Sequence, residues 1–193
     1  MSSRKGSKQG GKRPPRPASE GRSRVGIYVA AGIGVVAFIG LVAFITSDIA
    51  ENPQGSADPP PGVEVVSIEA PAHTENPVAY SSTPGAGGPH HPRWLTCQAY
   101  DEPVIEEMAV HTLEHGAIWI AYQPDLPEGD IEALEGLTRS SQVMSSPYPG
   151  LDVPVVLTAW ARQLRMDTVD VDVADQFIRA FRDATAPEAN SSC

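Results

Sequence analysis

The longest apolar run of the chain spans residues 25–45, where 21 consecutive residues carry no charge. At about 1.5 Å per residue, a helix of this length crosses the roughly 30 Å hydrocarbon core of a bilayer. A cleaved signal peptide usually has a shorter apolar region, of about 7–15 residues, with small residues at the −3 and −1 positions. The nearest candidate cut follows Ala50 and places Asp48 at −3, so the pattern favours a retained transmembrane helix.

After this span, short apolar segments alternate with polar ones. Three segments have the pattern of β-strands, and a fourth resembles one: residues 63–70, 117–122, 153–160 and 162–166. Three have apolar residues at helical spacing: residues 106–115, 130–140 (with Asp130 as the expected cap) and 172–184. The order predicts an α+β fold, a small mixed sheet with two or three helices, preceded by one transmembrane helix.

Charge divides the chain into two opposite parts. Residues 1–24 hold eight Lys or Arg and one acid, a net +7, whereas residues 46–193 hold 23 acids, six arginines and no lysine, a net −17. Basic residues directly before a membrane span remain in the cytoplasm, so the acidic part is expected outside. An acidic body repels phosphate, which excludes nucleic acid as its partner. The expected partners are the lipid bilayer and, through the acidic surface, a membrane protein complex.

These boundaries predict five parts. They are a basic disordered cytoplasmic tail (1–24), the transmembrane helix (25–45), a Pro-rich linker (46–62), an extracytoplasmic α+β domain (63–188) and a C-terminal tail (189–193). Inside the domain, residues 73–92 are rich in Pro, Gly, Ser and His. Loops longer than about 12–15 residues are usually functional or disordered.

Four of the five histidines fall between residues 90 and 115. His111 and His115 are four residues apart, so on a helix they project from one face. Two imidazoles in this register commonly hold a divalent metal, and His90 in the preceding loop can close the site. The pattern predicts a zinc or copper site at His90, His111 and His115. Weaker candidate ligands are His91, Glu114 and Cys97.

Two other interpretations of the histidines stay open. Residues 111–115 match H-x-x-E-H, the inverted zincin motif, but Gly116 and an apolar strand follow at once, whereas those peptidases need the motif inside a long helix. Without a metal, the histidines would cap the helix or bond to backbone carbonyls. His73 is expected to lie outside the cluster in either case.

Cys97 and Cys193 are the only cysteines, and both follow the predicted span. An oxidising compartment favours a disulfide between them. The alternative is that Cys97 is a thiolate ligand, which a disulfide would prevent.

Several strings in the outer part resemble a family of bacterial membrane-anchored proteins with a domain of unknown function. They are Gly-Gly-Pro-His-His, then Trp94 and Cys97, Tyr-Asp-Glu-Pro-Val, Val-His-Thr-Leu-Glu-His-Gly and Val-Leu-Thr-Ala-Trp-Ala-Arg. The resemblance covers about residues 73–188, and His-x-Leu-Glu-His-Gly is its most specific part. It implies architecture and location but no activity.

The sequence therefore favours a membrane-anchored, extracytoplasmic domain of uncharacterised function that binds a divalent metal through its histidines. One alternative is a non-catalytic interaction or assembly module of a membrane complex. Another is a small metal-dependent enzyme in which Glu114 acts as general base on a metal-bound water.

Overall fold

The computed structural model describes residues 57–189 and 193, which belong to one compact unit, Ile49–Cys193. The predicted cytoplasmic tail and membrane span, residues 1–45, lie outside the described residues. None of the helices in the described part is long and apolar enough to cross a membrane.

The described part of the chain has a mixed α+β fold, with a five-stranded sheet and three α-helices. The strand order is β1–β7–β6–β4–β5, and the strands are β1 (Glu64–Val65), β4 (Ile118–Tyr122), β5 (Val143–Pro147), β6 (Val155–Ala159) and β7 (Arg162–Met166). Neighbours are antiparallel except for β4 and β5, which are parallel. The parallel pair requires a crossover, which the chain makes through a helix.

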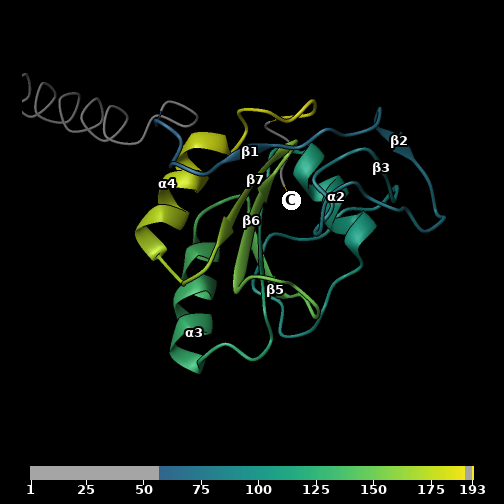
Figure 1. Cartoon of the computed structure of the whole chain (residues 1–193). Coiled ribbons are helices and arrows are strands. Elements are labelled where there is room, and N and C mark those ends of the chain that lie inside the picture. The colour runs from purple at the N-terminus through teal and green to yellow at the C-terminus, as the bar shows by residue number, and fades with distance from the viewer. Residues whose placement is uncertain (1–56, 190–192) are drawn as a thin grey trace, which may run out of the picture. The chain divides into compact units, whose positions relative to one another are not determined.

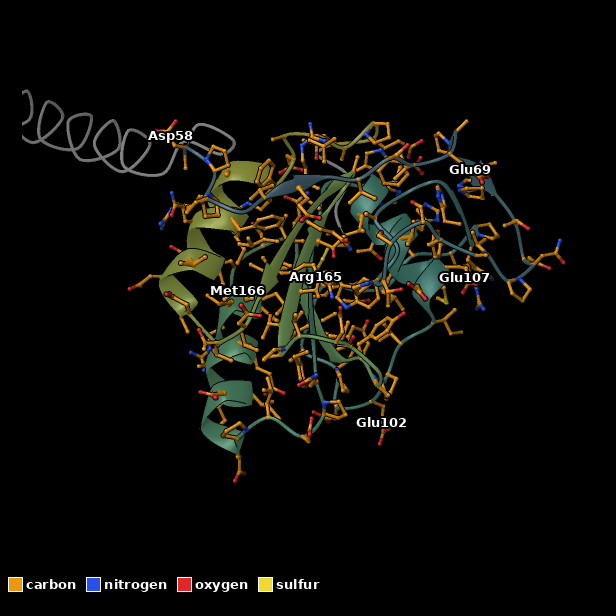
Figure 2. The ribbon with its side chains drawn as sticks, viewed as in Figure 1. Asp58, Glu69, Glu102, Glu107, Arg165 and Met166 are labelled. Carbon is orange, nitrogen blue, oxygen red and sulfur yellow. A yellow bond between two sulfur atoms is a disulfide. The ribbon has the colours of Figure 1, made fainter. Side chains whose placement is uncertain are left out.

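Helices cover both faces of the sheet (Figure 1). α3 (Glu128–Gly136), which continues into a short 3-10 turn (Leu137–Arg139), lies with α4 (Val171–Phe181) on one face, and α2 (Glu106–Glu114) lies on the other. Met166 of β7 belongs to the core beneath α3 and α4, and its neighbour Arg165 bonds to the carbonyl of Thr83 in the loop on the α2 side (Figure 2).

β4 is buried along its whole length because both of its faces are covered. Ile118, Ile120 and Tyr122 pack in the core that includes Leu134 of α3 and Phe177 of α4. The residues between them, Trp119 and Ala121, pack in the core that includes α2. Side chains alternate between the faces of a strand, so an unbroken apolar run is what a strand buried on both faces requires.

Three details of the predicted elements are wrong. The strand expected over residues 63–70 is only two residues long, because it pairs with β7 at the edge of the sheet and Ile68 then packs toward α2. Asp130 is not a cap: α3 begins at Glu128, after the extended Pro127, whose carbonyl accepts the N–H of Asp130. The strand β5 was not predicted, because Ser-Ser-Pro is typical of a turn. Its Ser146 is buried and accepts the indole N–H of Trp119.

Gly116 ends the histidine-bearing helix. Its φ is +97°, a conformation that residues with a Cβ rarely adopt, and a Cβ built there would lie 2.3 Å from Oδ1 of Asp183 and 3.1 Å from its Cα. The carbonyl of Gly116 also accepts the backbone N–H of Asp183 at 3.0 Å. Glycine at this position therefore lets the chain turn directly from α2 into β4, with the segment after α4 packed against the turn.

We expect Gly116→Ala to lower the free energy of unfolding by roughly 1–3 kcal/mol, because it combines the unfavourable backbone conformation with a steric clash. Urea denaturation followed by circular dichroism measures this loss. Gly136→Ala is the matched control: Gly136 lies in α3 with no atom within 4 Å of an added Cβ, so the change should be neutral or stabilising by about 0.5–1 kcal/mol. Equal stability of the two variants would contradict the prediction.

Candidate metal centre

Three segments far apart in the sequence meet at the C-terminal end of α2. β2 (Ala72–His73) and β3 (Pro89–His90) form a parallel pair in which His73 lies opposite His90. The backbone N–H of His91 then donates to the carbonyl of Glu107, which fixes β3 against α2. The pairing places both strand histidines beside the helix that carries His111.

Two acids at the start of α2 hold the long loop that leads to His90. Glu106 accepts the N–H of Gly85 at 2.6 Å and the hydroxyl of Tyr148 at 3.1 Å, and Glu107 accepts the N–H of Val78 at 3.0 Å. Burial raises the pKa of Glu106, and burial beside these acids raises the pKa of Tyr148 to about 12. Such bonds to charged acceptors are stronger than neutral ones, so the loop is ordered where it approaches α2.

Four side chains converge to form a set that could hold one metal ion: His73, His90, His111 and Glu114. One ligand atom from each lies within 4.8 Å of every other. In a tetrahedral zinc site with ligand distances of about 2.0–2.1 Å, the ligand atoms lie about 3.3–3.4 Å apart. The most widely separated atoms of the set would therefore have to approach one another by up to about 1.4 Å when an ion binds. His73 is exposed and the other three residues are buried.

The nitrogen of His90 that faces this set has no hydrogen-bond partner. Nδ1 of His90 bonds to the carbonyl of Gly88 at 2.8 Å, which leaves Nε2 to face the carboxylate of Glu114. Nε2 and Oε2 of Glu114 are 3.0 Å apart but not in hydrogen-bonding geometry, and Nε2 is buried without a partner. Buried polar atoms normally have a partner, and an ion is one of the groups that explain an exception.

His111 has its second ring nitrogen, Nε2, in a hydrogen bond of 3.2 Å with Nε2 of His115. Its Nδ1 bonds to the carbonyl of His91 at 2.6 Å, so in the neutral ring the lone pair is on Nε2. Burial lowers the pKa of His111, the bond to His91 opposes this shift, and the nearby rings of His90, His115 and His73 add to it. His111 is therefore neutral at pH 7, the form in which imidazole binds metals. A backbone carbonyl that fixes the tautomer is the usual outer partner of a ligating histidine.

His115 lies directly beside the set. Its Nε2 is 3.2 Å from Nε2 of His111 and 3.6 Å from Oε2 of Glu188, while its Nδ1 is buried without a hydrogen-bond partner. The indole of Trp94 covers both helix histidines, with ring centroids 4.9 Å from His115 and 5.5 Å from His111. The arrangement shields this side of the centre with an aromatic ring and leaves a carboxylate beside His115.

A cavity of about 300 Å³ opens beside the set. Its lining includes three of the four convergent residues, and the full lining is Pro71, Ala72, His73, His90, Glu114 and Glu188. An ion held by the set would therefore face the cavity as well as the protein. Closed structural zinc sites lack such an open side, whereas sites that accept a water or another ligand have one.

One known protein family matches more than half of the chain. Residues 72–193, which include every residue of the centre, match the family described as Protein of unknown function (DUF3105). The chain belongs to this family. No curated protein and no solved structure matches the chain.

Within this DUF3105 domain, the structure brings together some of the predicted ligands and separates others. His90, His111 and the weaker candidate Glu114 belong to the convergent set, and His115 adjoins it. The side chain of His91 bonds instead to the N–H of Arg93, so only its carbonyl faces the centre.

The structure corrects the prediction for His73 and decides between the two alternatives for Cys97. His73 was expected outside the cluster and lies in it, because the β2–β3 pairing sets it opposite His90. Cys97 and Cys193 are paired at disulfide distance, with Cα atoms 5.3 Å apart, so Cys97 is not available as a thiolate ligand.

Two residues at the site, His73 and Glu188, were not predicted from the sequence to lie there. A strand of two residues has no periodicity, so nothing in the sequence reveals that Ala72–His73 pairs with Pro89–His90. Glu188 is one of many acids in an acidic domain, and its position beside His115 depends on the path of the chain after α4.

Proposed function

We propose that this protein is a membrane-anchored, extracytoplasmic metal-binding protein. The ligands of one divalent ion are His73, His90, His111 and Glu114. The observation that carries the proposal is the buried, unpartnered Nε2 of His90, which lies 3.0 Å from a buried carboxylate within a set of convergent ligand atoms. A divalent ion would satisfy this nitrogen and compensate the buried charge of Glu114 together.

The donor set suits zinc or copper. Three imidazole nitrogens and one carboxylate oxygen are intermediate to hard donors, which these ions bind well, and no thiolate is present to select a softer ion. The interpretation without metal has the histidines bonded to the backbone, and two of them do bond to carbonyls. Those bonds use Nδ1 only. Nε2 of His90 has no hydrogen-bond partner, and Nε2 of His111 is bonded to Nε2 of His115, a bond that an ion would replace.

The proposal is tested by elemental analysis of the full-length protein, purified in detergent without chelator or affinity metal. We expect about one equivalent of zinc or copper. Addition of a chelator should then lower the melting temperature by roughly 5–10 °C, because an ion present at a hundred times its Kd stabilises the folded state by about 2.7 kcal/mol. A protein without bound metal that is also indifferent to added Zn²⁺ and Cu²⁺ would refute the site.

The location is supported by the apolar run at residues 25–45 and by the basic residues before it. A periplasm-dependent reporter fused after Cys193 should be active, and protease added to spheroplasts should remove the outer domain. A cytoplasmic C-terminus, or a mature protein that begins near Ser47, would refute the anchored topology.

A small metal-dependent enzyme is the second candidate, and the cavity beside the ligand set favours it. In this function Glu114 would be a ligand rather than the general base that the sequence suggested, because its carboxylate lies against His90. Azide added to Co²⁺-loaded protein should change the visible spectrum if a coordination position opens to the cavity. An unchanged spectrum would favour simple metal binding.

A further inference from the structure

The four-residue set leaves an imbalance of charge. A divalent ion bound by three neutral imidazoles and one carboxylate carries one excess positive charge, and three of the four ligands are buried. An uncompensated charge in such surroundings is unfavourable. One more carboxylate would make the centre neutral.

Glu188 is the carboxylate in position to do this. It lines the same cavity as His73, His90 and Glu114, and its Oε2 is 3.6 Å from Nε2 of His115. Its side chain is 60% exposed, so it stands at the mouth of the cavity rather than inside it. Nε2 of His115 is in turn 3.2 Å from Nε2 of His111. His115 therefore connects Glu188 to the four-residue set.

The C-terminal tail that carries Glu188 is fastened to the domain on each side of it. The backbone N–H of Glu188 donates to the carbonyl of Glu114 at 3.1 Å. One of the four proposed ligands therefore also forms a hydrogen bond with the tail. Ala186 packs in the core beneath α2, and Cys193 is joined to Cys97. Cys97 follows the segment that places Trp94 against His115, and Leu95 of that segment donates its N–H to Thr112 of α2.

We infer that Glu188 is a further carboxylate of the metal centre, which the Cys97–Cys193 disulfide holds at the mouth of the cavity. The inference rests on the proposed metal function. It assigns the disulfide a role in metal affinity as well as in stability, because release of Cys193 frees the tail on one side of Glu188. Glu188 thus adds a negative charge at the mouth of the cavity, whereas the four ligands come from the β2–β3 pair and α2.

A mutant cycle tests both parts of the inference. Zn²⁺ affinity is measured on the full-length protein by competition with a chelating indicator, for wild type, Glu188→Gln, the Cys97→Ser/Cys193→Ser pair, and all three changes together. Glu188→Gln should raise the Kd about tenfold, and the serine pair should raise it similarly. The triple variant should bind no more weakly than the serine pair, because both changes remove the same carboxylate.

Glu132→Gln is the control for charge alone, since Glu132 is exposed on α3, across the sheet from the centre. It should leave the Kd unchanged. If Glu188→Gln binds Zn²⁺ as tightly as wild type while His111→Ala does not, the role of Glu188 is overturned and the metal site stands. If the serine pair keeps wild-type affinity, or if its effect multiplies with that of Glu188→Gln, the role of the disulfide is overturned. A wild-type protein that binds no Zn²⁺ overturns the inference together with the proposed function.

Discussion

Replacement of His111 by alanine is expected to abolish tight Zn²⁺ binding, with a Kd at least about 100-fold higher. His111 is the central ring of the centre: its centroid is 4.7 Å from those of His90 and His115 and 5.0 Å from that of His73. Loss even of outer partners of a metal site typically costs 10–100-fold in affinity, so loss of a central ligand should cost more. Competition titration measures the affinity, and the chelator effect on the melting temperature should disappear.

His91→Ala is the matched control for His90→Ala. The two histidines are adjacent, but the side chain of His91 bonds to Arg93, and its carbonyl, which holds His111, is retained in the variant. We expect near wild-type affinity for His91→Ala, and a loss for His90→Ala and for His73→Ala. Variants that lose the same stability with and without Zn²⁺ would instead support histidines that only bond to the backbone.

Removal of the disulfide should have the largest effect on stability. The bond joins residues 96 apart in the sequence, and a loop of about 100 residues corresponds to about 4.7 kcal/mol in the loop-entropy model. The Cys97→Ser/Cys193→Ser pair should therefore unfold at a much lower urea concentration than wild type. The measurement is a chelator-treated urea titration, so that any change in metal affinity does not contribute.

Wild-type protein treated with a reductant and then alkylated should match the serine pair. The untreated protein should not react with an alkylating agent, since the described part of the chain has no free cysteine. Equal unfolding midpoints for the oxidised protein and the serine pair would contradict the prediction, as would rapid alkylation of both thiols without reductant.

The sequence by itself determined most of the regular elements. Both buried strands around Trp119 and Leu157 were predicted because apolar runs bounded by polar residues are typical of a sheet covered on two faces. The helix at residues 106–114 was predicted because acids begin it and Gly116 ends it. The same helix made the pairing of His111 and His115 predictable, because positions four apart share a face.

Tertiary structure alone decided which groups join that pair. His73 and His90 become neighbours through two strands of two residues each, and their pairing depends on contacts with α2 rather than on a local pattern. Glu188 reaches His115 because the chain returns past α2 after the last helix and ends at a disulfide. Local periodicity in the sequence indicates which face of a helix or strand is buried. A metal centre is assembled from side chains that long-range packing brings together, and local periodicity does not indicate that packing.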